Sequence, residues 1–391
     1  MRSAALALAC ALLGAGAALG IALAAGLLDR STTRTVVVRE PGPPRNLPAA
    51  VRSVAPVRPA GFSPARIYAR RSPGVVTIYS TFGGTAAQGS GFVVSRSGLV
   101  LTNAHVITTA GETTGPARPA AHVYVAFADG DRIPARIVGW DVFDDVGVVR
   151  VARSAHALVP LPLGRSTDVV VGEPVAAIGS PLGNTDSLAA GIVSAVRRSI
   201  ASLTAPSFQL IDAIQTDAPI AHGSSGGPLL DAAGRVIGIT AQLRSDQGGP
   251  SGVGFAVPID AARRSLHDLL TKGHVAYAFA GLETENLTPA LAAHLRLHVS
   301  HGALVDRAEP GGPAAEAGIR GGASAQQFEG QTVRVGGDVV VAIDGLPVAS
   351  ADDLVRIVTN RLRPGETALF TIVRAGRRRA VPVTLVARAP G

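Results

Sequence analysis

Cysteine is almost absent from this sequence of 391 residues, because the only one is Cys10. A single cysteine excludes any disulfide within the chain, so a folded region must be stabilised by its hydrophobic core. The 47% content of hydrophobic residues is sufficient for such a core. At this length we expect two folded domains with flanking segments rather than one.

Aromatic residues make up only 4% of the chain, and Lys272 is the single lysine. The net charge of +8 therefore comes almost wholly from arginine. These arginines are scattered and are not interleaved with aromatic side chains, whereas a single-strand binder needs stacking platforms along a basic groove. We therefore expect no nucleic-acid partner, and we interpret the charge as solvation with weak attraction to anionic lipid headgroups or cell-wall polymers.

Glycine and proline are abundant, with 46 and 27 residues. From Ile67 to about Pro258, short apolar segments alternate with glycine-containing turns, and this pattern predicts an antiparallel barrel or sandwich. A helix over Ile259 to Leu270 is expected to close the region, because Thr271-Lys272-Gly273 follow as a stop signal. The expected strands are Gly74 to Tyr79, Gly91 to Val94, Leu99 to Thr102, His122 to Phe127, Ile133 to Val138, Val146 to Val151, Val175 to Ile178, Gly191 to Val196 and Val236 to Ala241.

The beginning of the chain has no charged residue from Ser3 to Leu28. A secretory signal needs only about 7–15 apolar residues and a spanning helix needs roughly 20, so the length favours a membrane anchor over residues 1–28. The small residues Ala22-Leu23-Ala24 leave a cleaved signal as the alternative. Residues 29–60 are rich in proline and arginine without a hydrophobic period, which is typical of a solvated linker. The expected localisation is extracytoplasmic, either anchored by one span or secreted or periplasmic after cleavage.

The last part of the chain, from Ala276 to about Ala387, predicts a compact α+β module. Ser350-Ala351-Asp352-Asp353 resembles a capping box, and apolar residues follow it at helical spacing. Pro313 and Gly318 bracket a second, shorter helix. The predicted organisation is 1–28 anchor or signal, 29–60 linker, 61–272 first folded domain and 276–388 second folded domain.

A histidine and an aspartate have the setting that serine-based amide hydrolysis requires, namely a base and an acid that orients it. His105 follows an expected strand in Thr102-Asn103-Ala104-His105-Val106. Asp145 lies 40 positions later, at the head of another expected strand. Asp141 and Asp144 compete with it for this role, and we interpret both as residues of a solvated turn.

The candidate nucleophile is Ser225, in Gly223-Ser224-Ser225-Gly226-Gly227-Pro228. The glycines allow the backbone to fold tightly and to direct consecutive N–H groups into one concavity, as an oxyanion hole needs. Ser224 is the alternative nucleophile. Asp217 is expected to support this loop rather than to take part in the chemistry.

These motifs together resemble the HtrA family, also called Deg proteases, in which a trypsin-like serine protease is fused to a C-terminal PDZ domain. The resemblance covers about residues 62–388. It rests on Gly89-Ser-Gly-Phe-Val-Val, Leu101-Thr-Asn-Ala-His-Val, Asp145-Val-Gly-Val-Val-Arg-Val, Gly179-Ser-Pro-Leu-Gly, Gln215-Thr-Asp-Ala, Gly223-Ser-Ser-Gly-Gly-Pro and Gly252-Val-Gly-Phe-Ala-Val-Pro. It implies a mostly β fold, a chymotrypsin-like double barrel followed by an α+β PDZ domain, with no metal and no cofactor.

The resemblance also implies roles for single residues. Ser225 would attack, His105 would act as base and then acid, and Asp145 would orient the imidazole, with the N–H groups of Gly223 and Ser225 as the oxyanion hole. The substrate pocket would be lined by Ile220 and Leu243. No acid stands six residues before the serine, where Pro219 is found, so a small or medium aliphatic residue is expected before the cut.

The sequence departs from the family before the nucleophile. Relatives usually have Asn-Pro-Gly-Asn there, whereas this chain has Ala221-His222-Gly223-Ser224, which leaves the resting state of the oxyanion loop open. In the second domain, the loop Phe279, Ala280, Gly281 and Leu282 matches the one that holds a peptide's terminal carboxylate. Ala280 replaces a bulkier residue, and Gly321 to Gly337 is an insertion to which the sequence assigns no function.

The predicted function is therefore that of an ATP-independent extracytoplasmic endopeptidase that cleaves unfolded or damaged proteins. Its expected partners are such substrates, peptide C-termini at the PDZ domain, the membrane through the N-terminal segment, and copies of itself. A trimer through the segment Phe62 to Tyr68 is implied by the family. The alternatives are a chaperone that binds unfolded chains without cleaving them, and a PDZ scaffold with an idle protease domain.

Overall fold

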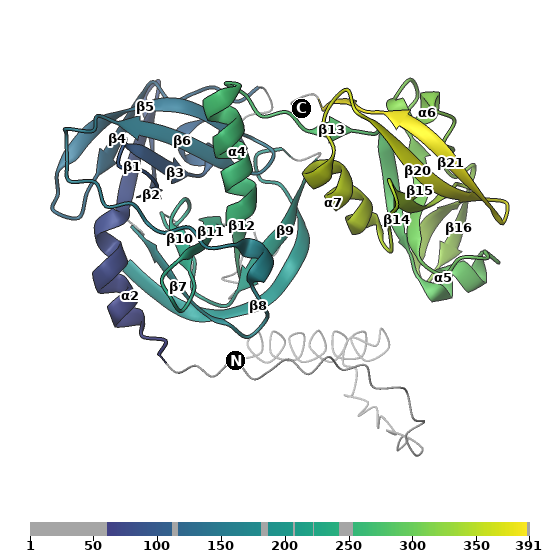
Figure 1. The fold of residues 1–391 in the computed structure, drawn as a ribbon, viewed down its shortest axis with the longest axis horizontal. Coiled ribbons are helices and arrows are strands. Elements are labelled where there is room, and N and C mark those ends of the chain that lie inside the picture. Colours follow the sequence, from purple (N-terminus) through teal and green to yellow (C-terminus); the bar gives the residue numbers. More distant parts are fainter. Residues whose placement is uncertain are drawn as a thin grey trace, which may run out of the picture. The chain divides into compact units, whose positions relative to one another are not determined.

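Six strands close a first β-barrel in the order β1-β2-β3-β6-β5-β4 (Figure 1). The structure is a computed structural model that describes residues 61–111, 116–180, 187–205, 208–221, 223–241 and 253–388. β-Branched residues dominate strands such as VVTIYSTF of β1, and they favour extended, half-buried backbone. The elements here are α2 (Pro64–Arg71), η1 (Ser72–Gly74), β1 (Val75–Phe82), β2 (Thr85–Val93), β3 (Leu99–Thr102), α3 (Ala104–Ile107), β4 (His122–Ala126), β5 (Arg132–Asp141) and β6 (Val146–Val151).

Six further strands close a second barrel in the order β10-β11-β12-β9-β8-β7. The first barrel has the same order of pairing except for a shift in numbering, so the two barrels repeat one antiparallel plan. The elements are η2 (Ser166–Asp168), β7 (Pro174–Gly179), β8 (Ser187–Ala201), β9 (Gln209–Thr216), β10 (Pro228–Leu230), β11 (Val236–Ala241), β12 (Gly254–Pro258) and α4 (Ile259–Thr271).

Buried apolar side chains form one core inside each barrel and a third that joins them. The first core includes Ile78 and Val100, and the second includes Val175 and Ile214. The third contains residues of both barrels, including Leu101, Leu230 and Ile239, together with Ile259 of α4. This third core packs the two barrels against each other, so residues of both barrels can contribute to one site between them.

Helix α4 packs against β5 and β6 of the first barrel and β11 and β12 of the second (Figure 1). Its apolar residues recur at helical spacing, and Ile259, Ala262 and Leu269 are buried. Leu269 contacts the backbone of β5 at Gly139, where a Cβ atom would lie 2.8 Å from its Cδ2. The helix predicted over Ile259 to Leu270 is confirmed with one further residue.

The C-terminal region contains a sheet in the order β14-β15-β18-β20-β21, with β19 paired to β18, and α7 packs on it (Figure 1). Ser350 caps α7, because its hydroxyl oxygen accepts from Asp353 N at 3.1 Å. The predicted insertion forms the hairpin β16–β17. The elements are β13 (Ala278–Phe279), β14 (Leu282–Leu287), α5 (Pro289–His294), β15 (Gly302–Ala308), α6 (Pro313–Glu316), β16 (Ser324–Phe328), β17 (Gln331–Val335), β18 (Val339–Ile343), β19 (Leu346–Pro347), α7 (Ala351–Arg361), β20 (Thr367–Arg374), β21 (Arg377–Thr384) and β22 (Val386–Ala387).

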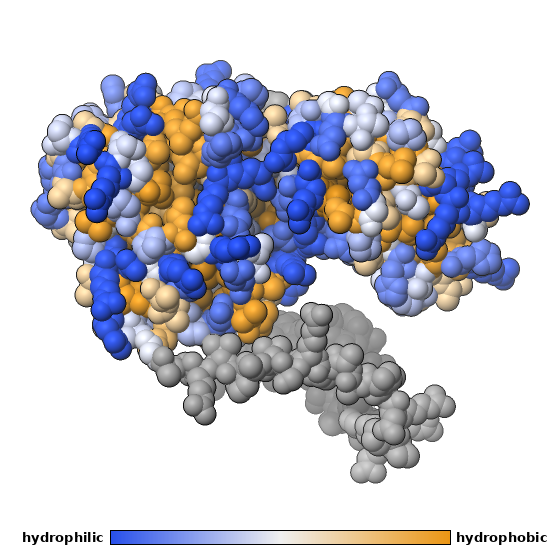
Figure 2. Space-filling model, in the orientation of Figure 1, coloured by the Kyte–Doolittle hydropathy of each residue, from blue (hydrophilic) through white to orange (hydrophobic). Residues whose placement is uncertain are grey.

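The predicted fold class, a double β-barrel followed by an α+β region, is confirmed. The predicted anchor and linker, residues 1–60, lie outside the described residues. Within the described ranges, the structure has no helix that is both long and apolar enough to cross a membrane. Figure 2 shows one face, on which hydrophobic patches lie between hydrophilic side chains.

Candidate active site

The structure brings His105 and Asp145 into direct contact. Asp145 Oδ2 lies 2.8 Å from His105 Nδ1, and Asp145 Oδ1 accepts from the backbone N–H of His105 at 3.1 Å. Both carboxylate oxygens therefore hold the same residue. A carboxylate only accepts hydrogen bonds, so it places the imidazole proton on Nδ1 and leaves Nε2 as an acceptor. Asp145 itself is 5% exposed.

The backbone of Asp145 is in the left-handed region, with φ of 51°. This conformation is unfavourable for a non-glycine residue and persists only where neighbouring groups hold it. The buried Asn103 supplies one such contact, since its Nδ2 donates to the Asp145 carbonyl at 2.8 Å. Gly147 allows the backbone of Asn103 to lie this close to the strand, because a Cβ atom on Gly147 would lie 2.7 Å from the Asn103 carbonyl oxygen. Sequence reasoning did not single out Asn103, although it stands two residues before His105.

The interpretation of Asp141 and Asp144 as a solvated turn is wrong, because each is 2% exposed. Asp141 Oδ2 accepts from Ser265 Oγ and from the Tyr277 hydroxyl, both at 2.6 Å. The same hydroxyl lies 2.7 Å from Asp144 Oδ2, which also forms an ion pair with Arg264 at 2.7 Å. Their partners lie more than 100 positions along the chain, so the local sequence contains no sign of this burial.

This cluster contains more acceptors than its hydroxyl can satisfy. Tyr277 has one hydroxyl proton and cannot donate to both carboxylates at once, whereas a proton on Asp141 satisfies both short contacts. Burial, together with repulsion from Asp144, raises the pKa of Asp141 to about 6. Burial also raises the pKa of Tyr277 well above its usual value. The catalytic candidate Asp145 thus follows a buried acidic pair in which burial favours the protonated form of Asp141.

Ser225 lies in the turn before β10 and is 5% exposed. Its carbonyl oxygen accepts from Ser90 N of β2 at 2.8 Å, which ties the second barrel's serine to the first barrel. Gly223 and Gly226 both have φ of 90°. A Cβ atom on Gly226 would lie 2.1 Å from the Ser90 carbonyl oxygen, so this position requires glycine for space as well as for backbone angle.

Ser90 connects the residues around Ser225 through four hydrogen bonds. Its Oγ–H donates to the Gly223 carbonyl at 2.6 Å, and its Oγ accepts from Ser180 N at 2.9 Å. Its carbonyl accepts from Thr102 Oγ1 at 2.7 Å, and its N–H binds Ser225 as described. The side chain is fully buried. In the sequence, Ser90 stands out only through its place between Gly89 and Gly91 in an expected strand motif.

Gly89 brings the neighbours of His105 and Ser225 together. A Cβ atom on Gly89 would lie 2.6 Å from a Val106 methyl group and 3.1 Å from the Ser225 carbonyl oxygen. Val106 follows His105 directly in α3, so the helix that bears the histidine and the turn that bears the serine meet over this glycine. The structure therefore gathers His105, Asp145 and Ser225 at the junction of the two barrels.

The predicted substrate pocket is described in part. The Ile220 side chain packs against Gly254 at the start of β12, where a Cβ atom would lie 2.5 Å from Ile220 Cδ1. Leu243 lies outside the described residues. Asp217 Oδ1 accepts from Ile192 N of β8 at 2.7 Å, so this carboxylate stabilises the β8–β9 pair. No group of three or more His, Cys, Asp or Glu side chains within the described ranges is arranged to hold a metal ion.

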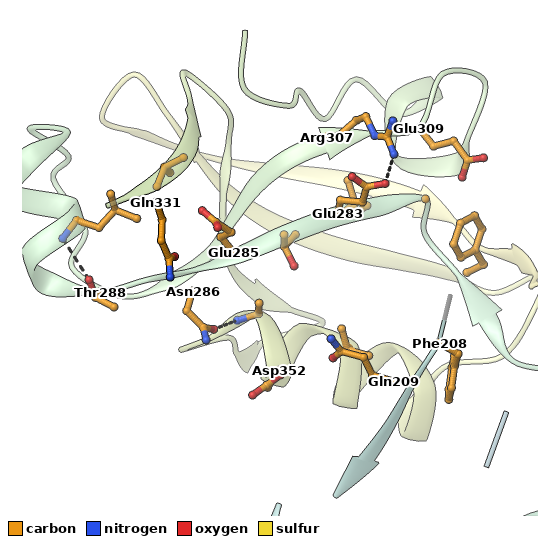
Figure 3. Close-up of a pocket in the computed structure, with 18 of the residues that line it drawn as sticks. Phe208, Gln209, Glu283, Glu285, Asn286, Thr288, Arg307, Glu309, Gln331 and Asp352 are labelled. Carbon is orange, nitrogen blue, oxygen red and sulfur yellow. Dashed lines mark hydrogen bonds and ion pairs between the residues drawn. The ribbon is translucent and has the colours of Figure 1, made fainter. Parts of the chain in front are cut away.

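The predicted carboxylate loop connects β13 to β14. Gly281 has φ of 70°, which glycine adopts without strain. Its carbonyl accepts from Glu309 N and the Ala280 carbonyl accepts from Ala314 N, both at 2.9 Å. Both carbonyls are therefore bound within the domain. A pocket of about 970 Å³ runs from Phe279 along β14 (Figure 3).

Two family models match the chain. A model of the trypsin-like peptidase domain matches residues 89–239, and a model of the PDZ domain matches residues 279–385. The first match includes the three candidate triad residues, and the second includes the candidate carboxylate loop.

Among known proteins, the chain is 36% identical over 297 residues to a "Probable periplasmic serine endoprotease DegP-like" from Pseudomonas fluorescens, covering 76% of this chain and 56% of that protein. It is also 36% identical over 297 residues to "Protease Do-like 1, chloroplastic" from Arabidopsis thaliana, covering 76% and 63%. The chain thus spans little more than half the length of these relatives.

Among solved structures, "HtrA-type protease AlgW with tripeptide" matches with a TM-score of 0.70 and 32% identity over 84% of this chain and 98% of that one. A serine endoprotease from Yersinia pestis matches with a TM-score of 0.60 and 28% identity, covering 84% and 98%. These similarities extend over both the barrels and the C-terminal region.

Proposed function

Because the chain belongs to the HtrA/DegP family of serine proteases, with a trypsin-like domain and one C-terminal PDZ domain, we propose that it is a serine endopeptidase whose triad is His105, Asp145 and Ser225. The observation that carries the proposal is the 2.8 Å contact between Asp145 and His105 at the barrel junction where Ser225 lies. We assign residues 61–272 to the protease domain and residues 276–388 to the PDZ domain.

In this mechanism, Nε2 of His105 accepts the proton of Ser225 as the serine oxygen attacks the scissile carbonyl. Asp145 keeps the imidazole in the required tautomer and stabilises its charged form. The N–H groups of Gly223 and Ser225 stabilise the oxyanion. His105 then donates the proton to the leaving amine. A protonated imidazole cannot accept the serine proton, so activity falls at acid pH.

The substrate pocket is assigned to Ile220 and Leu243, with a small or medium aliphatic residue before the cut. Pro219 stands where a preference for basic residues requires an acid. The packing of Ile220 against Gly254 supports an apolar wall at this place.

The biological role is inferred from the family alone. We propose quality control or regulated proteolysis of unfolded or damaged proteins outside the cytoplasm, with residues 1–28 as an anchor or signal. Curated relatives are described as periplasmic and chloroplastic. We also propose a homo-oligomer, a trimer through Phe62 to Tyr68. Phe62 and Tyr68 are partly buried against the core that joins the barrels.

The C-terminal domain is proposed to bind peptide C-termini through the loop Phe279 to Leu282. A peptide would extend the sheet at β14, which stands at the end of the sheet order. Solved relatives described as AlgW are in complex with a tripeptide and a decapeptide, which supports a peptide-binding role.

Labelling with a fluorophosphonate tests the proposed nucleophile. We expect covalent modification of Ser225, located by peptide mass spectrometry, and none in Ser225→Ala or His105→Ala. A chain that is correctly folded by circular dichroism but is not labelled, with or without a C-terminal peptide, would support the scaffold with an idle protease domain. Full cellular function of Ser225→Ala would support the chaperone.

A further inference from the structure

The pocket along β14 continues around the edge of this strand (Figure 3). Leu282 and Asn286 face α7, because Leu282 packs in the core with Val355 and Asn286 Oδ1 accepts from Ala351 N at 2.7 Å. Glu283 and Glu285 alternate with them and so face the opposite side. A peptide added to β14 would present its alternate side chains to these two different surfaces.

The hairpin β16–β17 forms part of the second surface. Glu285 is opposite Leu304 of β15, so the two side chains share a face of the sheet. Leu304 and Val333 of the hairpin belong to one buried cluster, and Phe328 of the hairpin packs against this cluster. Gln331 of this hairpin and Glu285 both line the pocket (Figure 3). The insertion that the sequence left without a role therefore lines the peptide groove.

Some of the acidic residues that line this groove form an ion pair with a basic side chain, and others do not. Glu283 forms an ion pair with Arg307 of β15. Within the described residues, Glu285, Glu329 and Asp352 form no ion pair, although all three line the pocket. Partial burial and repulsion from Asp306 raise the pKa of Glu285, as expected of a carboxylate without a nearby cation. The negative charge stands out because the whole chain has a net charge of +8.

The charge changes along the groove. Arg388 lines it together with Phe279, and its guanidinium lies 5.1 Å from the Phe279 ring centroid, at the carboxylate-loop end. Glu285 lies three positions beyond Leu282, about 10 Å along the strand. A bound peptide runs antiparallel to β14, with its carboxylate at the loop. Its residues about two to four positions before the end would therefore lie beside the acids that form no ion pair.

Resting on the proposed peptide-binding function, we propose that this groove selects C-termini with Lys or Arg about two to four positions before an apolar last residue. Glu285, Glu329 and Asp352 recognise the basic side chains. The apolar last residue lies between Leu282 and Val355. The hairpin β16–β17 supplies Glu329 and so contributes to specificity.

The test uses the full chain with Ser225→Ala, which prevents cleavage, and four fluorescent decapeptides followed by anisotropy. Three end in Ala-Val and have Lys, Ala or Glu at the second to fourth positions before the last residue. The fourth is the Lys peptide with a C-terminal amide. We expect the Lys peptide to bind about five- to tenfold more tightly than the Ala peptide, with the Glu peptide weakest. High salt should reduce the difference.

Charge reversal separates recognition from folding. Glu285→Lys should invert the preference in favour of the Glu peptide, an outcome that misfolding cannot produce. Glu316→Lys is the matched control, because Glu316 is exposed on α6 and does not line the pocket. Equal binding of Lys and Glu peptides, or an equal effect of both variants, would overturn the inference alone. If the amide binds as well as the free acid, or if no peptide binds, the proposed C-terminus binding fails as well.

Discussion

Single buried polar residues hold the candidate site in place. Ser90 is fully buried, and its hydroxyl both donates to the Gly223 carbonyl and accepts from Ser180 N. Each of those backbone groups would lose its partner if the hydroxyl were removed. Buried polar groups without partners are costly, because they lost water on folding and gain nothing in return.

We expect Ser90→Ala to lower the free energy of unfolding by about 1–3 kcal/mol. It should also lower kcat, since the Gly223 carbonyl adjoins the proposed oxyanion N–H groups. Urea unfolding and peptide hydrolysis measure the two effects. Ser97→Ala removes an exposed hydroxyl of the neighbouring turn and should change stability by less than about 0.5 kcal/mol. Equal effects of the two variants would show that the Ser90 contacts do not support the site.

The buried pair Asp141 and Asp144 gives stability a specific pH dependence. The pKa of Asp141 is raised from 3.8 to about 6, so the folded chain holds a proton that the unfolded chain releases. The contribution of this bound proton to the free energy of unfolding is therefore greatest below pH 3.8 and is lost as the pH rises towards 6. Asp141→Asn keeps the shape of the side chain and removes the titration.

We expect the stability of the parent relative to Asp141→Asn to decrease between pH 4 and pH 6 and to become constant above this range. Urea unfolding of both chains at several pH values measures the difference. Ser97→Ala, which changes no titratable group, should run parallel to the parent. A parent curve parallel to that of Asp141→Asn would show that Asp141 does not titrate in this window.

Each of the three triad candidates could be singled out from the sequence because it lies in a short motif with glycine or strand signals beside it. It failed for Asp141 and Asp144 because their partners Ser265 and Tyr277 come from distant segments. Asp141 and Asp144 were interpreted as solvated, whereas the hydroxyls of Ser265 and Tyr277 contact this pair and Arg264 forms an ion pair with Asp144. Burial of this kind depends on tertiary contacts that no local pattern contains.

At the scale of elements, α4 is the part that the periodicity predicted best. Its apolar spacing and its stop signal are both local, so the predicted range differs by one residue from the observed one. Strand β9 and the hairpin β16–β17 were not predicted. β9 mixes Gln209 and Asp212 with apolar residues, and the hairpin is largely exposed, so neither has a strong alternating pattern.

Neighbouring leucines of α4 provide a matched test of its packing. Leu269 is 4% exposed against β5, whereas Leu270 is 44% exposed. We expect Leu269→Ala to lower the free energy of unfolding by about 2–5 kcal/mol through loss of burial and a residual cavity. Leu270→Ala should stay within about 0.5 kcal/mol of the parent. A similar loss of unfolding free energy for both variants would mean that the packing of Leu269 against β5 does not stabilise the fold.

At the scale of the whole molecule, the site exists only where the two barrels meet. In the first barrel, α3 provides His105 and the turn before β6 provides Asp145, and in the second barrel the turn before β10 provides Ser225. The Ser90 N–H to Ser225 carbonyl bond, 2.8 Å long, joins the two halves. The sequence predicted two folded domains and their classes, but only the closed pairing of strands shows how separated motifs come together.

The most direct test of the central claim is cleavage of unfolded casein by the full chain and by its Ser225→Ala variant, with new termini identified by mass spectrometry. A C-terminal peptide is added in parallel reactions, so that a resting enzyme is also detected. We expect cleavage by the parent alone, mostly after small or medium aliphatic residues. Equal cleavage by both chains, or none by the parent even with peptide, would contradict Ser225 as the nucleophile of an endopeptidase.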